Sequence, residues 1–225
     1  MLFSYVCEEK VTDGQAMRID HDDFCEVLEK IRLGSRAAAA EWLTDMWVAG
    51  IATGLRPAEW PLAYVDRQDG RTNLHIISVH NQEIWTHRTL IITDLPSATL
   101  DSIERTVEQA RTWLLKGDFP ARQGEVSRVL AHVCQSFFKK KLHFDLATLR
   151  FQFISNMKAV HTPDVAAALI GHISKVEAAH YVNHRAAWPV REIVERPAAV
   201  AEQAARMRTR IRYRDERAQF WTPIH

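Results

Sequence analysis

The stretch Ala52-Thr-Gly-Leu-Arg-Pro-Ala-Glu-Trp60 lies where one helical pattern ends and another begins. Apolar residues recur at helical spacing over residues 43–51, which predicts an amphipathic helix that begins near Ser35. Gly54 is placed to end this helix in a left-handed conformation, and Pro57 suits the first turn of a new helical segment. The sequence therefore predicts a tight corner between two helical segments.

Arg56 lies within this corner, so its backbone has little freedom. A guanidinium fixed in this way is suited to bind a phosphate through two parallel hydrogen bonds. The alternative interpretation is that Arg56 only pairs with Glu59, three residues later in the chain. On the sequence of the corner alone, the two interpretations are equally supported.

After the corner, the pattern changes to one that is typical of strands. We expect strands over residues 62–66, 72–79 and 89–93, with a hairpin turn at Gln68-Asp-Gly-Arg71. Helical patterns follow over residues 100–115 and 124–140, and Arg150 begins a further helix. The predicted fold class is mainly α with a small three-stranded antiparallel sheet.

A second motif lies near the carboxyl terminus. Thr162-Pro-Asp164 predicts a helix start, and Gly171 predicts the end of that helix. Ser174-Lys-Val-Glu177 has the spacing of a capping box that opens another helix. This arrangement holds His172 between two helices and presents Tyr181 about two turns into the second helix.

These motifs together resemble the catalytic domain of the tyrosine recombinase (phage integrase) family, over about residues 35–188. The resemblance depends on the order and spacing of Arg56, Arg150, His172 and Tyr181. It implies the tyrosine recombinase catalytic-domain fold and a function in site-specific DNA recombination or integration. Tyr181 would attack a DNA phosphodiester to form a 3′-phosphotyrosyl intermediate, while the other three side chains stabilise the phosphate. No cofactor or metal ion is implied, because the covalent link conserves the bond energy.

One departure from the family pattern lies in the predicted hairpin. There the family usually has a lysine that protonates the departing 5′ oxygen, but this chain has no lysine between Lys30 and Lys116. Nearby cations or proton donors are His80, His87 and Arg88, and a histidine is suited to act as an acid near neutral pH. The alternative is that this chain has lost the proton donor that the family has in the hairpin.

A second departure precedes Arg150. The family string is His-x-x-Arg, whereas Ala147 occupies the histidine position here and His143 lies four residues earlier. The sequence therefore supports two functions, an active strand transferase or a catalytically degenerate module that binds DNA or a partner recombinase. A helical protein–protein module that carries these motifs by chance is disfavoured by their joint spacing.

Three regions are predicted: an N-terminal extension (1–34), the recombinase-like catalytic domain (35–190) and a basic helical tail (191–225). The extension is too short for the DNA-clamping domain that usually precedes the catalytic domain. We therefore expect a fragment, a one-sided grip on DNA, or a partner that supplies the clamp.

The tail carries eight arginines and five acidic residues over 191–217, and it is suited to contact DNA, a neighbouring protomer or its own domain. Candidate DNA-backbone contacts are Lys139, Lys140 and Lys141, although a solvated helix end is the alternative.

Composition limits the remaining options. The chain has 225 residues, a formal net charge of +1 and three cysteines without a Cys-x-x-Cys motif, which predicts a cytoplasmic protein in a reducing compartment. No apolar run is free of charges over the length of a membrane span, so we expect no membrane partner. His180 and His184 lie one helical turn apart, but they lack an adjacent carboxylate pattern and we predict no metal site. The expected partners are double-stranded DNA and a second copy of the chain or a partner recombinase.

Overall fold

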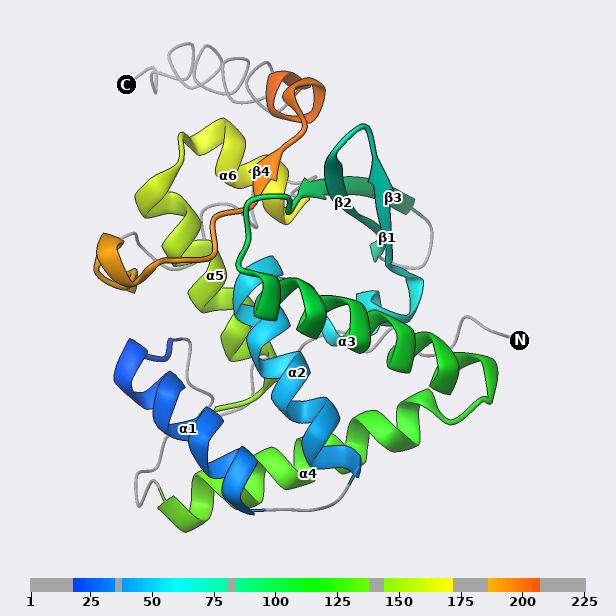
Figure 1. Cartoon of the computed structure of the whole chain (residues 1–225), viewed down its shortest axis with the longest axis vertical. Helices are drawn as coiled ribbons and strands as arrows, with labels where there is room; N and C mark the ends of the chain where they lie inside the picture. Colours follow the sequence, from blue (N-terminus) through cyan, green and yellow to red (C-terminus); the bar gives the residue numbers. More distant parts are fainter. Residues whose placement is uncertain (1–17, 35–37, 81–83, 138–143, 172–185, 207–225) are drawn as a thin grey trace, which may run out of the picture.

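The computed structural model describes residues 18–34, 38–80, 84–137, 144–171 and 186–206, and these form a mainly helical fold with one small sheet (Figure 1). Residues 201–206 are helical. The other elements, in chain order, are α1 (His21–Gly34), α2 (Ala38–Thr53), the 3-10 helix η1 (Pro57–Leu62), β1 (Tyr64–Gln68), β2 (Arg71–His80), β3 (Ile84–Ile91), α3 (Ser97–Leu115), α4 (Phe119–Phe137), α5 (Leu146–Val160), α6 (Pro163–Ile170), the 3-10 helix η3 (Val190–Glu192) and β4 (Ala198–Ala199).

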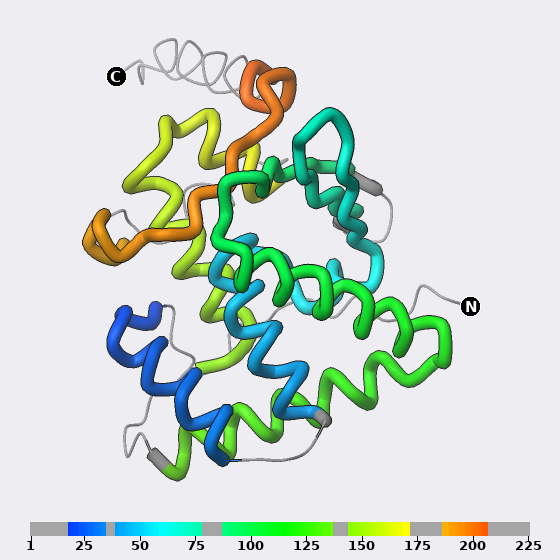
Figure 2. Tube along the Cα trace, viewed as in Figure 1, coloured from blue at the N-terminus to red at the C-terminus, as the bar shows by residue number. Residues whose placement is uncertain are grey.

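Helix α2 is the centre of the helical part and contacts α1, α3, α4 and α5 (Figure 2). Leu43, Met46 and Trp47 point into the core and are at most 2% exposed. Helix α5 comes close at Gly50, where an added Cβ would lie 2.7 Å from Cδ1 of Leu149. The absence of a side chain at this position therefore sets how closely the two helices pack.

Helix α1 shares this core. Its buried residues are Phe24, Val27 and Ile31, and the indole of Trp47 donates a hydrogen bond to the Phe24 carbonyl. The segment before α1 is also anchored, because Trp188 donates to the Ile19 carbonyl over 2.8 Å. The predicted start of the catalytic domain at residue 35 thus lies between two helices that pack on each other, and that boundary stays a prediction.

The sheet has the strand order β1-β2-β3-β4 and is antiparallel throughout. The predicted hairpin turn is confirmed between β1 and β2, where Asp69 and Gly70 have φ angles of 51° and 72°. The prediction of three strands is wrong, because Ala198 and Ala199 form a fourth strand that pairs with the edge of β3. This two-residue strand has no alternating pattern, and it forms because the returning chain satisfies an open strand edge.

Three helices begin earlier than predicted, and one of them is α3, which begins at Ser97 rather than at residue 100. Helix α5 begins at Leu146 rather than at Arg150, because the side chain of Asp145 accepts a hydrogen bond from the Thr148 backbone and caps the helix. Helix α4 begins at Phe119 rather than at residue 124. A proline as second residue is tolerated there, since the first turn of a helix does not use its backbone N–H groups internally.

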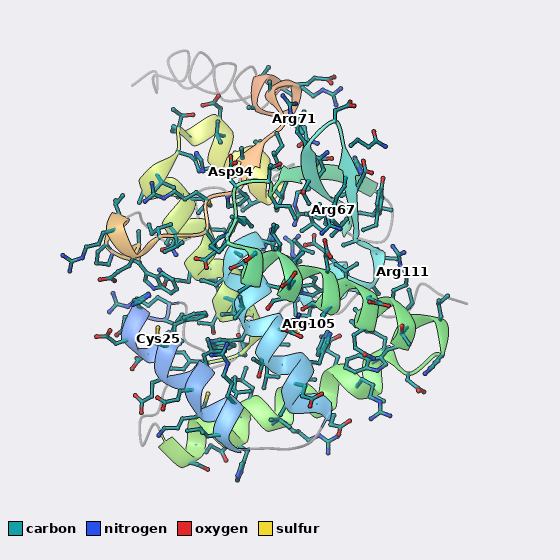
Figure 3. The ribbon with its side chains drawn as sticks, viewed as in Figure 1. Cys25, Arg67, Arg71, Asp94, Arg105 and Arg111 are labelled. Carbon is teal, nitrogen blue, oxygen red and sulfur yellow. The ribbon has the colours of Figure 1, made fainter. Side chains whose placement is uncertain are left out.

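Polar contacts hold α3 against its neighbours, and Figure 3 labels the three arginines that make them, Arg67, Arg105 and Arg111. Arg67 of β1 pairs with Glu104, and Arg111 donates to the carbonyl of Ala63 just after η1. Arg105 donates two hydrogen bonds to a carboxylate of α2. Helix α3 therefore links the sheet, η1 and the central helix, which fixes the corner at residues 53–57.

Candidate functional site

The corner after α2 has the conformation that the sequence predicts. Gly54 has a φ angle of 63°, and an added Cβ would lie 2.2 Å from the ring of Phe153. Pro57 then begins η1. The backbone N–H of Arg56 donates to Oε2 of Glu59 over 2.8 Å, and its guanidinium lies 3.4 Å from Oε1 of the same carboxylate. Because the side chain of Arg56 is 20% exposed, it can reach a ligand.

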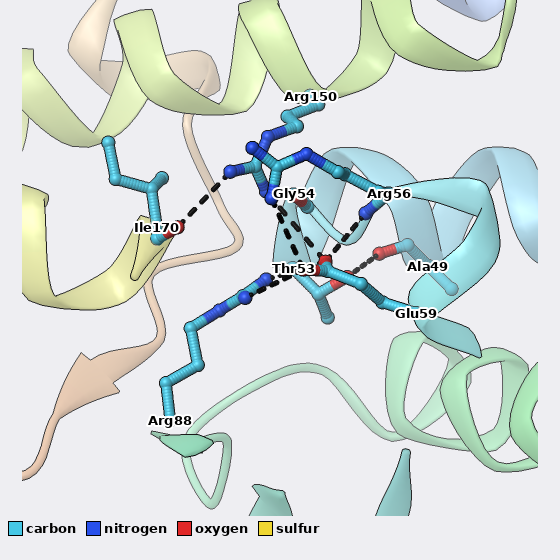
Figure 4. Close-up of polar contacts among 8 residues, drawn as sticks. All are labelled: Ala49, Thr53, Gly54, Arg56, Glu59, Arg88, Arg150 and Ile170. Carbon is cyan, nitrogen blue, oxygen red and sulfur yellow. Dashed lines mark hydrogen bonds and ion pairs between the residues drawn. The ribbon is translucent and has the colours of Figure 1, made fainter. Parts of the chain in front are cut away.

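Glu59 is the centre of the site and is only 4% exposed (Figure 4). Two guanidinium nitrogens of Arg88 donate to its two oxygens over 2.9 and 2.8 Å. The Arg150 guanidinium forms a longer ion pair with Oε2, at 3.9 Å. We call these four side chains, Arg56, Glu59, Arg88 and Arg150, the Glu59 cluster.

Burial on its own would raise the pKa of the Glu59 carboxyl, but the charge and hydrogen bonds of Arg88 outweigh it. The charges of Arg150 and Arg56 act in the same direction, so the pKa of this carboxyl lies well below its usual range. Glu59 is therefore ionised at neutral pH. Three guanidinium groups surround one carboxylate, which leaves two net positive charges in the cluster.

Arg150 is 1% exposed and joins three elements. It lies on α5 and donates to the carbonyl of Gly54 over 2.5 Å and to the carbonyl of Ile170 over 3.1 Å. The first carbonyl lies at the end of α2 and the second at the end of α6. Arg150 thus fixes the corner that carries Arg56 relative to the helix end that precedes His172.

Gly171 ends α6 in the predicted left-handed conformation, with a φ angle of 65°. An added Cβ at this position would lie 2.9 Å from Cδ of Arg88. The side chain of Arg88 therefore packs against the residue that directly precedes His172. Strand β3 and the end of α6 meet at the Glu59 cluster.

The structure brings two of the four predicted catalytic residues together. Arg56 and Arg150 lie on the same carboxylate although they are far apart in the sequence. Arg56 does pair with Glu59, as the alternative interpretation expects, and that carboxylate also binds two other arginines. His172 and Tyr181, like the candidate DNA contacts Lys139, Lys140 and Lys141, lie outside the described residues. The roles of all these residues stay predictions.

Sequence reasoning missed the position of Arg88, which it names only as one of several cations near the hairpin. The predicted strand over residues 89–93 begins too late, because β3 begins at Ile84 and therefore includes Arg88. Arg88 occupies an inward position of β3, in register with the buried Ile76 and two residues before the buried Leu90. An arginine at an inward strand position requires a buried acidic partner, and Glu59 provides one.

No protein-family model and no curated protein matches the sequence. Two solved structures of the XerH site-specific recombinase are similar to it at 12% sequence identity. One, a post-cleavage complex with palindromic difH substrate, matches with a TM-score of 0.50 over 73% of this chain and 48% of that chain. The other, a pre-cleavage complex with difH substrate, gives a TM-score of 0.52 over 76% of this chain and 51% of that chain.

The fold is that of a tyrosine recombinase catalytic domain. The predicted fold is therefore confirmed, apart from the fourth strand. The chain spans about half the length of the solved structures that it matches. At this identity the likeness shows the fold alone, so it does not transfer the residues or the activity of those recombinases to this chain.

Two further findings concern the described residues. Within them, no three histidine, cysteine or acidic side chains are grouped in a way that would hold a metal ion. None of the helices in this part of the chain is both long enough and apolar enough to cross a membrane. The Glu59 cluster has more positive than negative charges, which is the electrostatic property that favours an anionic ligand.

Proposed function

We propose that this chain is a tyrosine-type DNA strand transferase that acts in site-specific recombination or integration. The observation that carries the proposal is the convergence of Arg56 and Arg150 on one buried carboxylate. The fold supports it, since the similar solved structures are of a site-specific recombinase with its substrate. The ligand would be double-stranded DNA, with Lys139, Lys140 and Lys141 as further backbone contacts.

In the proposed reaction, the phenol oxygen of Tyr181 attacks a backbone phosphorus and the bond from phosphorus to the 5′ oxygen breaks. A 3′-phosphotyrosyl bond forms and a 5′ hydroxyl leaves. Arg56 binds a nonbridging oxygen, and Arg150 and His172 add positive charge as the pentacovalent phosphorane develops. Loss of one such donor typically costs about 3–4 kcal/mol of transition-state stabilisation.

A covalent-capture experiment tests this proposal without knowledge of the target site. The protein is incubated with a pool of nicked duplexes of random sequence, in which the cleaved end diffuses away and the protein–DNA adduct accumulates. We expect wild type to form an adduct that resists denaturation, and Tyr181→Phe to form none while its binding of intact duplex is nearly unchanged. Tyr64→Phe is a matched control, because Tyr64 lies on the exposed face of β1 and is 41% exposed. An adduct with Tyr181→Phe would show that another residue is the nucleophile.

One observation favours a second function, that of a degenerate recombinase-like module that binds DNA or a partner recombinase. Arg150 is nearly inaccessible and donates to two backbone carbonyls, as a structural arginine does. Ala147, at the position where the family has a histidine, is 7% exposed. Salt-sensitive binding of DNA by wild type, with no adduct from any duplex in the pool, would support this second function over the first.

A further inference from the structure

Arg88 is the most strongly bound partner of Glu59, although the proposed reaction gives it no role. It lies on β3, is 3% exposed, and its stem packs against Gly171. Its guanidinium takes both oxygens of Glu59 at hydrogen-bond distance (Figure 4). A paired arrangement of this kind is the strongest that an arginine and a carboxylate form.

The arginines of the Glu59 cluster compete for one carboxylate. Arg88 holds both oxygens at 2.9 and 2.8 Å, whereas the guanidinium of Arg56 lies 3.4 Å from Oε1. Arg150 is farther, at 3.9 Å from Oε2. Arg56 is also the most exposed of the three, at 20%. The distances therefore order the three pairs, with Arg88 first, Arg56 second and Arg150 third.

We propose that Arg88 is a positioning residue: by occupying both oxygens of Glu59, it prevents this carboxylate from forming a bidentate pair with Arg56. The guanidinium of Arg56 then keeps an orientation in which a DNA phosphate can bind to it. This inference depends on the proposed function, because it assumes that Arg56 binds phosphate.

Charge counting supports the same role. With Arg88 in place the cluster has two net positive charges, and without it only one. Without Arg88, Glu59 still has Arg56 and Arg150 beside it, and a buried carboxylate that loses its strongest partner pairs more closely with the cations that remain. Arg56 is the nearer of these two, and its backbone N–H already donates to the same carboxylate. Loss of Arg88 would thus weaken phosphate binding, although Arg88 itself is buried.

The test uses the full chain and a duplex of random sequence, about 30 base pairs long, with affinity measured by fluorescence anisotropy over a range of KCl concentrations. We expect Arg56→Gln to weaken binding about tenfold near 0.1 M KCl and to lower the slope of log affinity against log salt by about 0.9, as for one lost phosphate contact. Arg88→Gln should cause a similar loss. Arg105→Gln is the matched control, because Arg105 also donates two hydrogen bonds to one carboxylate but lies outside the cluster.

The double variant separates positioning from a general structural role. In Glu59→Gln there is no anion for Arg88 to restrain, so adding Arg88→Gln should not weaken DNA binding further. A further loss in that background, in a protein with a native circular dichroism spectrum, would overturn the proposal. Even if the single variant Arg88→Gln does not fold, the comparison of Glu59→Gln with the double variant still tests the proposal.

Two other outcomes separate a failure of the inference about Arg88 from a failure of the proposed function. If Arg88→Gln binds DNA as wild type does while Arg56→Gln is weak, Arg88 has no positioning role and the inference fails on its own. If Arg56→Gln binds as wild type does, the phosphate-binding role of Arg56 is wrong. The proposed function then loses its supporting observation, and the inference fails with it.

Discussion

Two arginines in this protein each donate two hydrogen bonds to one carboxylate, yet their surroundings are opposite. Arg88 binds Glu59 inside the fold, where both side chains are 4% exposed. Arg105 binds Asp45 on the surface, where the arginine is 57% exposed and the aspartate 17%. Their hydrogen bonds are equally short, at 2.7–2.9 Å. Hydrogen-bond lengths alone therefore do not distinguish the buried pair from the surface pair.

The difference lies in solvent and in the number of partners. Water screens the charges of Arg105 and Asp45, so a surface pair of this kind contributes about 0–1 kcal/mol. The Glu59 carboxylate is nearly inaccessible and has three cations around it. Without the carboxylate, the three guanidiniums would repel one another in a region of low dielectric constant. Burial thus strengthens the interactions within the Glu59 cluster, and the three arginines around one carboxylate make it electropositive.

The largest expected effect is on stability. We expect Glu59→Gln to lower the free energy of unfolding by about 3–5 kcal/mol, because it removes the buried negative charge that three guanidiniums share. Asp45→Asn should lower it by about 1 kcal/mol or less. Urea unfolding followed by tryptophan fluorescence measures both variants under the same conditions. Equal losses would show that burial does not separate the two pairs.

Much of the architecture follows from local sequence signals. Gly54, Pro57 and Gly171 have the backbone roles that their residue types predict, and the Asp-Gly turn lies where the hairpin requires it. These features depend on conformations that few residue types adopt, so they are visible in the sequence. The fourth strand was not predictable in this way, since its formation depends on an edge that only the folded sheet provides.

The candidate site was predictable only in part, for a similar reason. The corner motif identifies Arg56, and the resemblance to a family identifies Arg150. The sequence does not show that both lie on Glu59, because that contact joins segments far apart in the chain. Strand alternation places Arg88 inward only once the strand is known to begin at Ile84 rather than at residue 89, and its partner depends on how β3 packs against η1. Long-range polar contacts of this kind carry no periodic signal.

Two glycines extend the comparison between the buried site and the surface. Gly54 and Gly70 have similar φ angles, 63° and 72°, but only Gly54 is packed against another side chain. Alanine at either position is strained by about 1–2 kcal/mol. At Gly54 the added methyl also collides with Phe153, which adds about 1–3 kcal/mol. Thermal or urea unfolding of Gly54→Ala and Gly70→Ala measures the difference.

Gly54→Ala should also weaken DNA binding, because the Gly54 carbonyl accepts a hydrogen bond from Arg150. Gly70→Ala changes a turn where an added Cβ has no neighbour within 4 Å, so it is the matched control for the strain itself. Equal destabilisation by the two substitutions would contradict the close packing of the corner against α5.

The smallest expected effect is a difference between wild type and Glu59→Gln in how steeply the free energy of unfolding changes with pH. The pKa of Glu59 is lower in the folded protein than its ordinary value of 4.5, so the unfolded chain binds the proton more readily. Stabilisation by Glu59 is therefore complete above about pH 5 and is lost as the pH falls below 4.5 toward the folded pKa. Its slope cannot exceed about 1.4 kcal/mol per pH unit, because one proton is involved.

Urea unfolding between about pH 6 and 3 should thus show wild type losing stability faster than Glu59→Gln, so that their difference narrows in acid. Other carboxyls contribute to the acid response of both proteins and cancel in this difference. Asp45→Asn keeps Glu59, so its curve should retain the extra loss of stability that Glu59→Gln lacks. Parallel curves for wild type and Glu59→Gln would mean that Glu59 is not held ionised by its arginines. The buried pair would then differ from the surface pair in accessibility but not in electrostatics.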